Sequence, residues 1–206
     1  NVLFNYLPTK INLGFKFLIN ADFIPDGTRE FLHQLKWNEF LIEQAGLQFL
    51  SWIRMLALND RSPNKGDFLL LLPDFEQLAN QVSDDRNSQL LKLFKGGFDR
   101  GIQGFDHNLP IAFIPNINRE LSALQDILID QTGLVNLAPL QFSELTGITE
   151  IAIDPRLGTA TEKIEQRVRR YAGLGRIYTA DNFRVDLINE SFQAWLKTPL
   201  NNFNLI

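Results

Sequence analysis

Residues 7–38 read LPTKINLGFKFLINADFIPDGTREFLHQLKWN, and this stretch indicates the class of fold. Aromatic and β-branched residues dominate 2–7 and 13–23, so both segments are predicted to be strands, paired across a connection at 8–12. Pro25 and Gly27 mark a turn after the second strand. The hydroxyl of Thr28 is then expected to cap a short helix that begins at Arg29.

A long amphipathic helix is predicted directly after this stretch. Its apolar residues recur at intervals of three and four, as they do along one face of an α-helix. They are Trp37, Phe40, Leu41, Ala45, Phe49, Trp52, Ile53 and Leu56. Residues 59–67 combine proline, asparagine and glycine with charged residues, which is typical of a linker. We therefore expect one segment over 1–60 and a second over 67–206.

Beyond this linker, the pattern alternates between short apolar runs and helical periodicity. Strands are predicted at 68–72, 109–114 and 150–153. Helices are predicted at 74–82, 88–98, 118–128, 161–171 and 189–196. The whole pattern predicts an α/β (α+β) fold, with a small mixed sheet and long amphipathic helices.

The composition excludes several classes of function. A formal net charge of -4 argues against direct nucleic-acid binding, because surfaces that hold phosphates are usually basic. With no cysteine, the chain has no disulfide, no thiolate nucleophile and no cysteine-bound metal. No apolar run approaches the roughly 20 residues that span a bilayer. We therefore expect a soluble, cytoplasmic protein without a membrane partner.

No motif in the chain predicts an independent catalytic site. His33 and His107 are far apart in sequence, and neither has carboxylates at a metal-ligand spacing. Residues 99–104, DRGIQG, fit a glycine-rich helix end better than a nucleotide-binding loop. The chain lacks the P-loop, dinucleotide-binding and zinc-protease signatures. An independent hydrolase would also need a nucleophile, a base and an orienting group, and no such set is present.

The opening stretch resembles the segment that follows the ATP-binding domain in sacsin and its bacterial relatives. The shared pattern consists of a Leu-Pro turn, a glycine-led strand that ends in an Asn-Ala-Asp-Phe-like sequence, a short loop, a Ser/Thr-Arg-Glu or Ser-Arg-x element and a downstream Trp-Asn. Its members here are Leu7-Pro8, Gly14-Phe15, Asn20-Ala21-Asp22-Phe23, Thr28-Arg29-Glu30 and Trp37-Asn38. The resemblance covers roughly the first 55 residues, with a looser match over 114–134. It implies the middle (second) domain of a GHKL-type ATPase, as an internal fragment of a larger protein.

The resemblance also implies a role for Arg29. Thr28-Arg29-Glu30 is similar to the Ser-Arg-Glu of the heat-shock-protein-90 middle domain, whose arginine reaches the ATP γ-phosphate bound in the neighbouring domain. A guanidinium suits this role because it stays charged and forks across two phosphate oxygens. Thr28 keeps the hydroxyl of the family's serine, and Lys10 is a second candidate phosphate sensor. The alternatives are an Arg29 paired with Glu30 or Asp26, and a solvated Lys10.

Two functions follow as hypotheses. In the first, the chain is a coupling domain of a chaperone-like ATPase that is inactive as an isolated fragment. ATP and Mg²⁺ would be bound by the N-terminal ATP-binding domain of the parent protein, and a client protein would be a further partner. In the second, the chain is a stand-alone interaction or scaffold module without a nucleotide, and 37–58 and the C-terminal helices form its binding surface.

Overall fold

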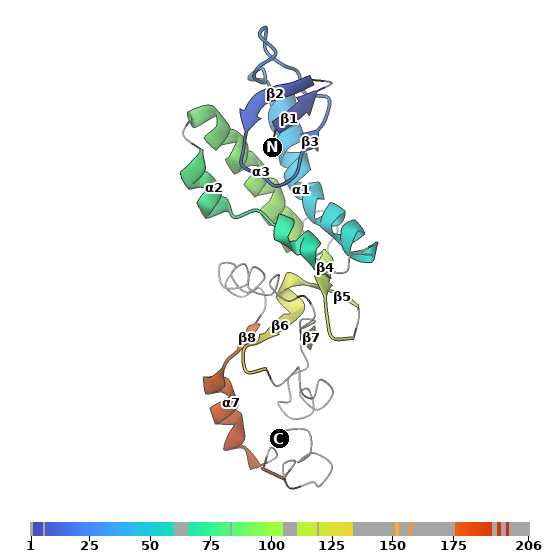
Figure 1. The fold of residues 1–206 in the computed structure, drawn as a ribbon, viewed down its shortest axis with the longest axis vertical. Helices are drawn as coiled ribbons and strands as arrows, with labels where there is room; N and C mark the ends of the chain where they lie inside the picture. The colour runs from blue at the N-terminus through green and yellow to red at the C-terminus, as the bar shows by residue number, and fades with distance from the viewer. Residues whose placement is uncertain are drawn as a thin grey trace. The chain divides into compact units, whose positions relative to one another are not determined.

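The computed structural model describes residues 2–5, 7–59, 66–82, 84–104, 111–118, 120–133, 151–152, 157, 176–190, 193–194 and 197 (Figure 1). Helices and small sheets are combined in this part, which confirms the predicted α+β class. The chain forms two compact units. The first comprises Asn1–Asn59 and Phe68–Ile111, and the second comprises Asp60–Asp67 and Ala112–Ile206. The expected division into 1–60 and 67–206 differs from this arrangement, because 68–111 belongs to the first unit.

The first unit begins with a small sheet of three strands in the order β2-β1-β3. Strand β1 (Val2–Asn5) pairs antiparallel with β2 (Leu7–Asn12) and parallel with β3 (Ile19–Asn20). The predicted connection at 8–12 is therefore wrong, since it forms most of β2. The physical reason is an alternation of buried and exposed residues over 9–12, which is the pattern of a strand. Of the strand predicted over 13–23, only Ile19–Asn20 pairs.

The helices of the first unit largely follow their predictions. Helix α1 (Lys36–Leu58) is the expected long helix. Helix α2 (Phe75–Gln81) is capped by Asp74, and α3 (Asp85–Gln103) is capped by Asp84 and ends at the left-handed Gly104. The strand predicted at 68–72 is wrong, because Asp67–Leu71 forms the 3-10 helix η1. A short buried apolar run is compatible with either structure, so its periodicity alone does not distinguish them.

The core of the first unit lies where α1 packs against α3 (Figure 1). A Cβ atom at Gly46 would lie 2.0 Å from the carbonyl oxygen of Phe94, and one at Gly97 would lie 2.0 Å from that of Glu43. The two helix backbones are therefore in direct contact, at a distance that only glycine allows. A cluster of aromatic rings adjoins this contact and extends to the segment before β3. Its members are Phe15, Phe17, Phe49, Phe75, Phe94 and Phe98.

The second unit contains two small sheets. Strands β4 (Ala112–Pro115) and β5 (Leu121–Ala123) are antiparallel and are followed by the 3-10 helix η2 (Leu124–Asp126). Strand β6 (Ile127–Asp130) lies between β7 (Ile151–Ala152) and β8 (Arg176–Tyr178), parallel to both. Helix α7 (Ala180–Leu187) follows β8.

The predictions for the second unit had mixed outcomes. The strands predicted at 109–114 and 150–153 are confirmed where the structure describes them, in β4 and β7. The helix predicted at 118–128 is wrong, because residues 122–124 and 127–129 are buried in succession and form β5, η2 and β6. Helix α7 was not predicted. The predicted helix at 161–171 lies outside the described residues, as does part of that at 189–196.

Candidate functional site

The segment between β3 and α1 forms a small hairpin that carries Arg29. Pro25 and Leu32 form an isolated antiparallel bridge. The backbone N–H of Asp26 donates to the carbonyl of Phe31 at 2.9 Å, and that of His33 donates to the carbonyl of Ile24 at 2.9 Å. The helix predicted to begin at Arg29 is therefore wrong, because this segment folds back on itself. We call residues 24–33 the arginine hairpin.

Hydrogen bonds from Thr28 hold the tip of the arginine hairpin. The Thr28 hydroxyl donates to Asp26 Oδ1 at 2.7 Å, and the same oxygen accepts the Thr28 backbone N–H at 3.1 Å. The Thr28 hydroxyl also accepts the backbone N–H of Glu30 at 3.3 Å. The pKa of Asp26 is below its usual value, mainly because its carboxylate accepts the hydrogen bond from the Thr28 hydroxyl. Thr28 thus stabilises a turn, where the sequence predicted a helix cap.

Arg29 lies at this tip with a left-handed backbone and an exposed side chain. Its φ is 60°, a conformation that non-glycine residues seldom adopt. Its backbone N–H donates to the carbonyl of Asp26 at 3.0 Å, which closes the turn. Among the residues that the structure describes, none forms an ion pair with the Arg29 guanidinium. The predicted alternative, a pairing of Arg29 with Glu30 or Asp26, is therefore not found in this part of the chain.

Lys10 joins the hairpin to strand β2. Its ammonium lies 2.6 Å from Glu30 Oε1, and its backbone N–H donates to the Glu30 carbonyl at 2.7 Å. Both side chains are largely exposed, so the ion pair contributes little stability of its own. Lys10, Thr28 and Arg29, which the sequence singled out separately, are thus brought to one edge of the first unit. Lys10 is paired and not simply solvated.

The start of α1 fastens the other side of the hairpin. The Asn38 side chain is only 2% exposed, and its Oδ1 accepts the Ile24 N–H at 2.8 Å. Its Nδ2 donates to the carbonyls of Ile24, at 2.8 Å, and His33, at 2.7 Å. The indole N–H of Trp37 donates to the Asp22 carbonyl at 2.9 Å. The Trp-Asn pair, known from the sequence only as part of a pattern, is therefore a clamp at the base of the hairpin.

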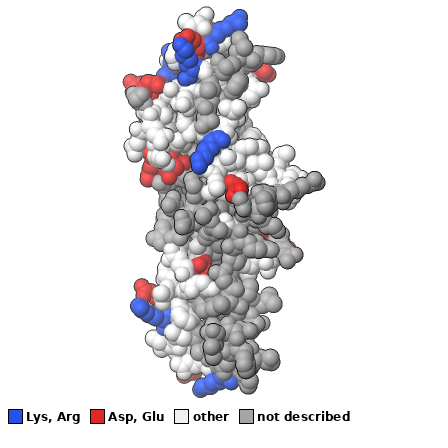
Figure 2. Space-filling view, in the orientation of Figure 1, with Lys and Arg blue, Asp and Glu red and all other residues white. Residues whose placement is uncertain are grey.

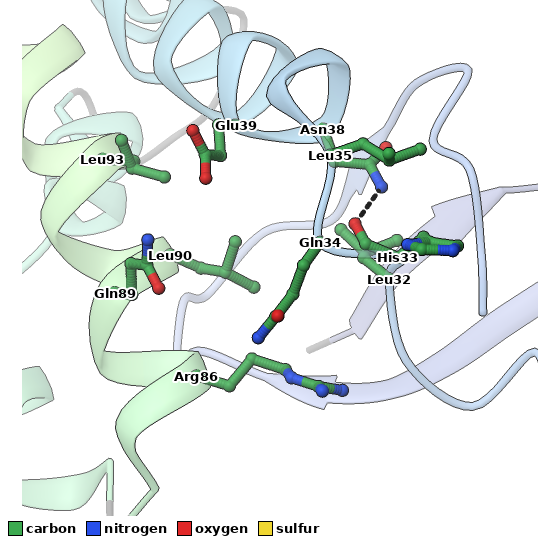
Figure 3. Close-up of a pocket in the computed structure, with 10 residues that line it drawn as sticks. All are labelled: Leu32, His33, Gln34, Leu35, Asn38, Glu39, Arg86, Gln89, Leu90 and Leu93. Carbon is green, nitrogen blue, oxygen red and sulfur yellow. Dashed lines mark hydrogen bonds between the residues drawn. The ribbon is translucent and has the colours of Figure 1, made fainter.

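A small pocket lies beside this clamp, between the hairpin and α3 (Figure 3). Gln34 and Arg86 lie near one end of it, and Glu39 and Leu93 lie near the other. Its volume is about 30 Å³. Since one water needs roughly 10–15 Å³, the pocket has room for a few waters and is too small for a nucleotide. The Arg86 guanidinium lies 5.4 Å from the centre of the Phe31 ring and so connects α3 to the hairpin.

The surface charge of the described residues shows no broad basic area on the face in Figure 2, where groups of both signs are interspersed. No three histidine, aspartate or glutamate side chains of the described residues are placed to hold a metal ion. Of the described helices, none has the length and apolar character needed to cross a membrane. His33 lies on the rim of the pocket, and His107 is outside the described residues. Comparison with protein-family models, curated proteins and solved structures finds no match for this chain.

Proposed function

We propose that this chain is a coupling domain, the middle (second) domain of a sacsin-like ATPase related to the heat-shock-protein-90 chaperones. In this proposal, Arg29 reaches the γ-phosphate of ATP held by the N-terminal ATP-binding domain of the parent protein. The observation that carries it is an exposed arginine at the tip of a braced hairpin. The two carboxylates nearest to it in sequence have other partners, since Thr28 bonds Asp26 and Lys10 pairs with Glu30.

The backbone strain at Arg29 supports this role. A left-handed conformation costs a non-glycine residue about 1–2 kcal/mol, so it persists only where the surrounding structure imposes it. Asp26, Thr28 and Asn38 supply that constraint through the hydrogen bonds of the tip and the base. A simple surface ion pair needs no such strain, and strained residues cluster at functional sites.

The chemistry expected of the site is electrostatic. A guanidinium stabilises the charge that spreads over the phosphate oxygens as the phosphoryl group departs. Lys10 would add a second cation near the same phosphate if its pairing with Glu30 opens, and Thr28 would keep the tip in shape. ATP and Mg²⁺ would both be bound by the neighbouring domain. We expect a cytoplasmic, chaperone-like protein whose ATP-driven closure is relayed through α1.

Replacing Arg29 with alanine in the parent protein tests this function. Turnover should fall by about 10³-fold if the arginine acts as a finger, because a forked cation is lost from the transition state. The affinity for ADP should stay unchanged, since ADP lacks the phosphate that Arg29 would contact. Steady-state ATPase assays and calorimetric titration measure the two effects.

Arg54→Ala is the matched control, because Arg54 is an exposed arginine of α1 outside the hairpin. It should leave turnover unchanged, and Lys10→Ala should have a milder effect than Arg29→Ala. A parent protein that keeps full turnover without Arg29 would refute the coupling role. The stand-alone scaffold module would then be the better hypothesis.

A further inference from the structure

One face of α1 carries large exposed apolar side chains towards both ends of the helix. Its large side chains are Trp37, Phe40, Trp52, Met55 and Leu58, which are 47%, 49%, 37%, 60% and 66% exposed. Gln44, Gln48 and Ser51 lie between them at helical spacing. We call these eight residues the outer face of α1. It contains no charged residue, because Lys36, Glu39, Glu43 and Arg54 occupy other positions around the helix.

The outer face points away from the packed side of α1. Ile42, Gly46, Leu50 and Ile53 are buried, and Gly46 is in contact with α3. The residues of the outer face lie on the side of the helix opposite Gly46. The ring centres of Trp52 and Phe17 lie 5.7 Å apart, and those of the stacked Trp37 and Phe40 lie 5.9 Å apart. These contacts hold the aromatic rings in place but leave much of their surface exposed.

The exposed apolar area of this face is large enough for an interface. At roughly 200 Å² for each large side chain, the exposed fractions of the five residues give about 500 Å², divided between one group at Trp37 and Phe40 and a second at Trp52, Met55 and Leu58. The largest apolar patch on a typical monomer covers about 300–600 Å² and is often functional. A standard interface buries roughly 800 Å² per partner, so this face is at the small end of the range.

We infer that a second copy of this chain binds this face, with the two α1 helices antiparallel. The order of side chains along the face is self-complementary about a two-fold axis between residues 47 and 48. Trp37 then lies opposite Leu58, Phe40 opposite Met55, and Gln44 opposite Ser51. The rings of Trp37 and Phe40 each meet a flexible aliphatic side chain, and the polar groups meet at the centre. The interface uses the same patch on both copies, as a two-fold dimer requires.

Charge and packing both favour this occupant. A partner that recognises charge finds none on the face, whereas two copies bring no like charges together. A parallel pair would place ring against ring at Trp37 and Phe40, and it would align the two helix dipoles. The antiparallel pair avoids both effects. Because the area is at the small end for interfaces, we expect association at micromolar concentrations.

The first test measures the mass of the full chain by sedimentation equilibrium over a wide range of concentrations. The expected result is a shift from 23.6 kDa towards twice that mass. Met55→Glu should weaken the association at least tenfold, because it buries a charge opposite Phe40. Ile188→Glu is the matched control, since Ile188 is 78% exposed outside α1, and it should leave the mass unchanged. A chain that stays monomeric at all concentrations would overturn the inference.

The second test reads the register through disulfide formation. The chain has no cysteine, so every disulfide comes from an introduced residue. The Gln48→Cys variant should form a disulfide-linked dimer by itself. In the antiparallel pair, the two copies of residue 48 are offset by only one residue, about 1.5 Å along the helix. The Gln44→Cys variant should form little disulfide-linked dimer. The two copies of residue 44 are offset by seven residues, about 10 Å, and a disulfide needs Cα atoms within about 7 Å.

Mixing Gln44→Cys with Ser51→Cys should restore the crosslink between two different chains. Efficient crosslinking of Gln44→Cys alone would show a parallel pair and overturn the antiparallel register. A wild-type chain that gains mass only when an added amphipathic peptide occupies α1 would show that the face binds another protein's helix. Both measurements are independent of nucleotide, so they can fail or succeed whatever Arg29 does.

Discussion

The backbone of Arg29 has a φ of 60°, which glycine adopts without the steric penalty of a Cβ atom. Its neighbour Gly27 would provide that freedom, yet the chain places the left-handed residue two positions later. The turn bond from the Arg29 N–H to Asp26 and the Thr28 bonds fix this register. The chain therefore places an arginine side chain at a position whose backbone conformation favours glycine.

Replacing Arg29 with glycine should give a more stable protein than replacing it with alanine, by about 1 kcal/mol. Both substitutions remove the guanidinium, but only glycine relieves the left-handed strain. Denaturant unfolding of the two variants measures the difference. At Arg54, inside α1, the order should reverse, because glycine destabilises a helix interior by about 1 kcal/mol relative to alanine. Equal stabilities at position 29 would mean that the hairpin relaxes out of its strained conformation.

The sequence selected individual candidate residues but did not predict their surroundings. Thr28 and Lys10 were singled out, yet the bond to Asp26 and the pairing with Glu30 depend on a hairpin that the sequence did not predict. Asn38 bonds to residues five and fourteen positions away. A buried asparagine carries no local signal of such distant partners, although its place beside Trp37 at a helix start was a hint.

The backbones of α1 and α3 are in close contact at Gly46 and Gly97, so an added side chain at either position should destabilise the packing. Gly97→Ala should destabilise the first unit by about 1–3 kcal/mol or more, because its Cβ would lie 2.0 Å from the Glu43 carbonyl oxygen. Gly96→Ala is the matched control one residue away, where an added Cβ has nothing within 4 Å. It should stabilise the helix by about 0.5–1 kcal/mol. Thermal unfolding of both variants checks the prediction, and similar melting temperatures would contradict the close packing of the helices.

Helical elements were more predictable than strands, for physical reasons. Helix α1 has many turns in which the apolar period repeats, and α2 and α3 have aspartate caps at their starts. The apolar residues at 118–128 fit a helical spacing, but Asn116 accepts N–H bonds from Asn118 and Glu120 and turns the chain. The parallel strands β6, β7 and β8 of the second unit come from segments far apart in sequence. Pairing at that range is not encoded in any local pattern.

The chain passes between its two units more than once, which affects how it responds to cleavage. Arg61 and Lys65 lie outside the described residues, in a segment rich in turn-forming residues. Brief trypsin treatment should cut there before it cuts within α1. The nicked protein should still elute as one species in gel filtration, because α1 and α3 stay packed across the cut. Denaturing electrophoresis should separate the pieces, and α1 cut as early as this segment would contradict the prediction.

The composition of 59–67 predicted a connection, and the chain does change units near there. It could not predict that the chain returns to the first unit at Phe68. That return brings α3 against α1, where Gly46 lies beside the backbone of Phe94 and Gly97 lies beside the backbone of Glu43. The described structure therefore supports the class of fold that the sequence predicted and changes its division into parts.

The glycine contact between α1 and α3 also has a mechanical consequence. Each backbone sits among the carbonyl groups of the other helix, so the helices cannot slide along one another without a steric collision. We therefore expect the two helices to move together as one rigid body about 35 Å long, given 1.5 Å for each residue of α1. Asn38 attaches the arginine hairpin to one end of this rigid body by three hydrogen bonds. A small tilt at the Met55 end of this rigid body would therefore displace the hairpin without any change of shape in between.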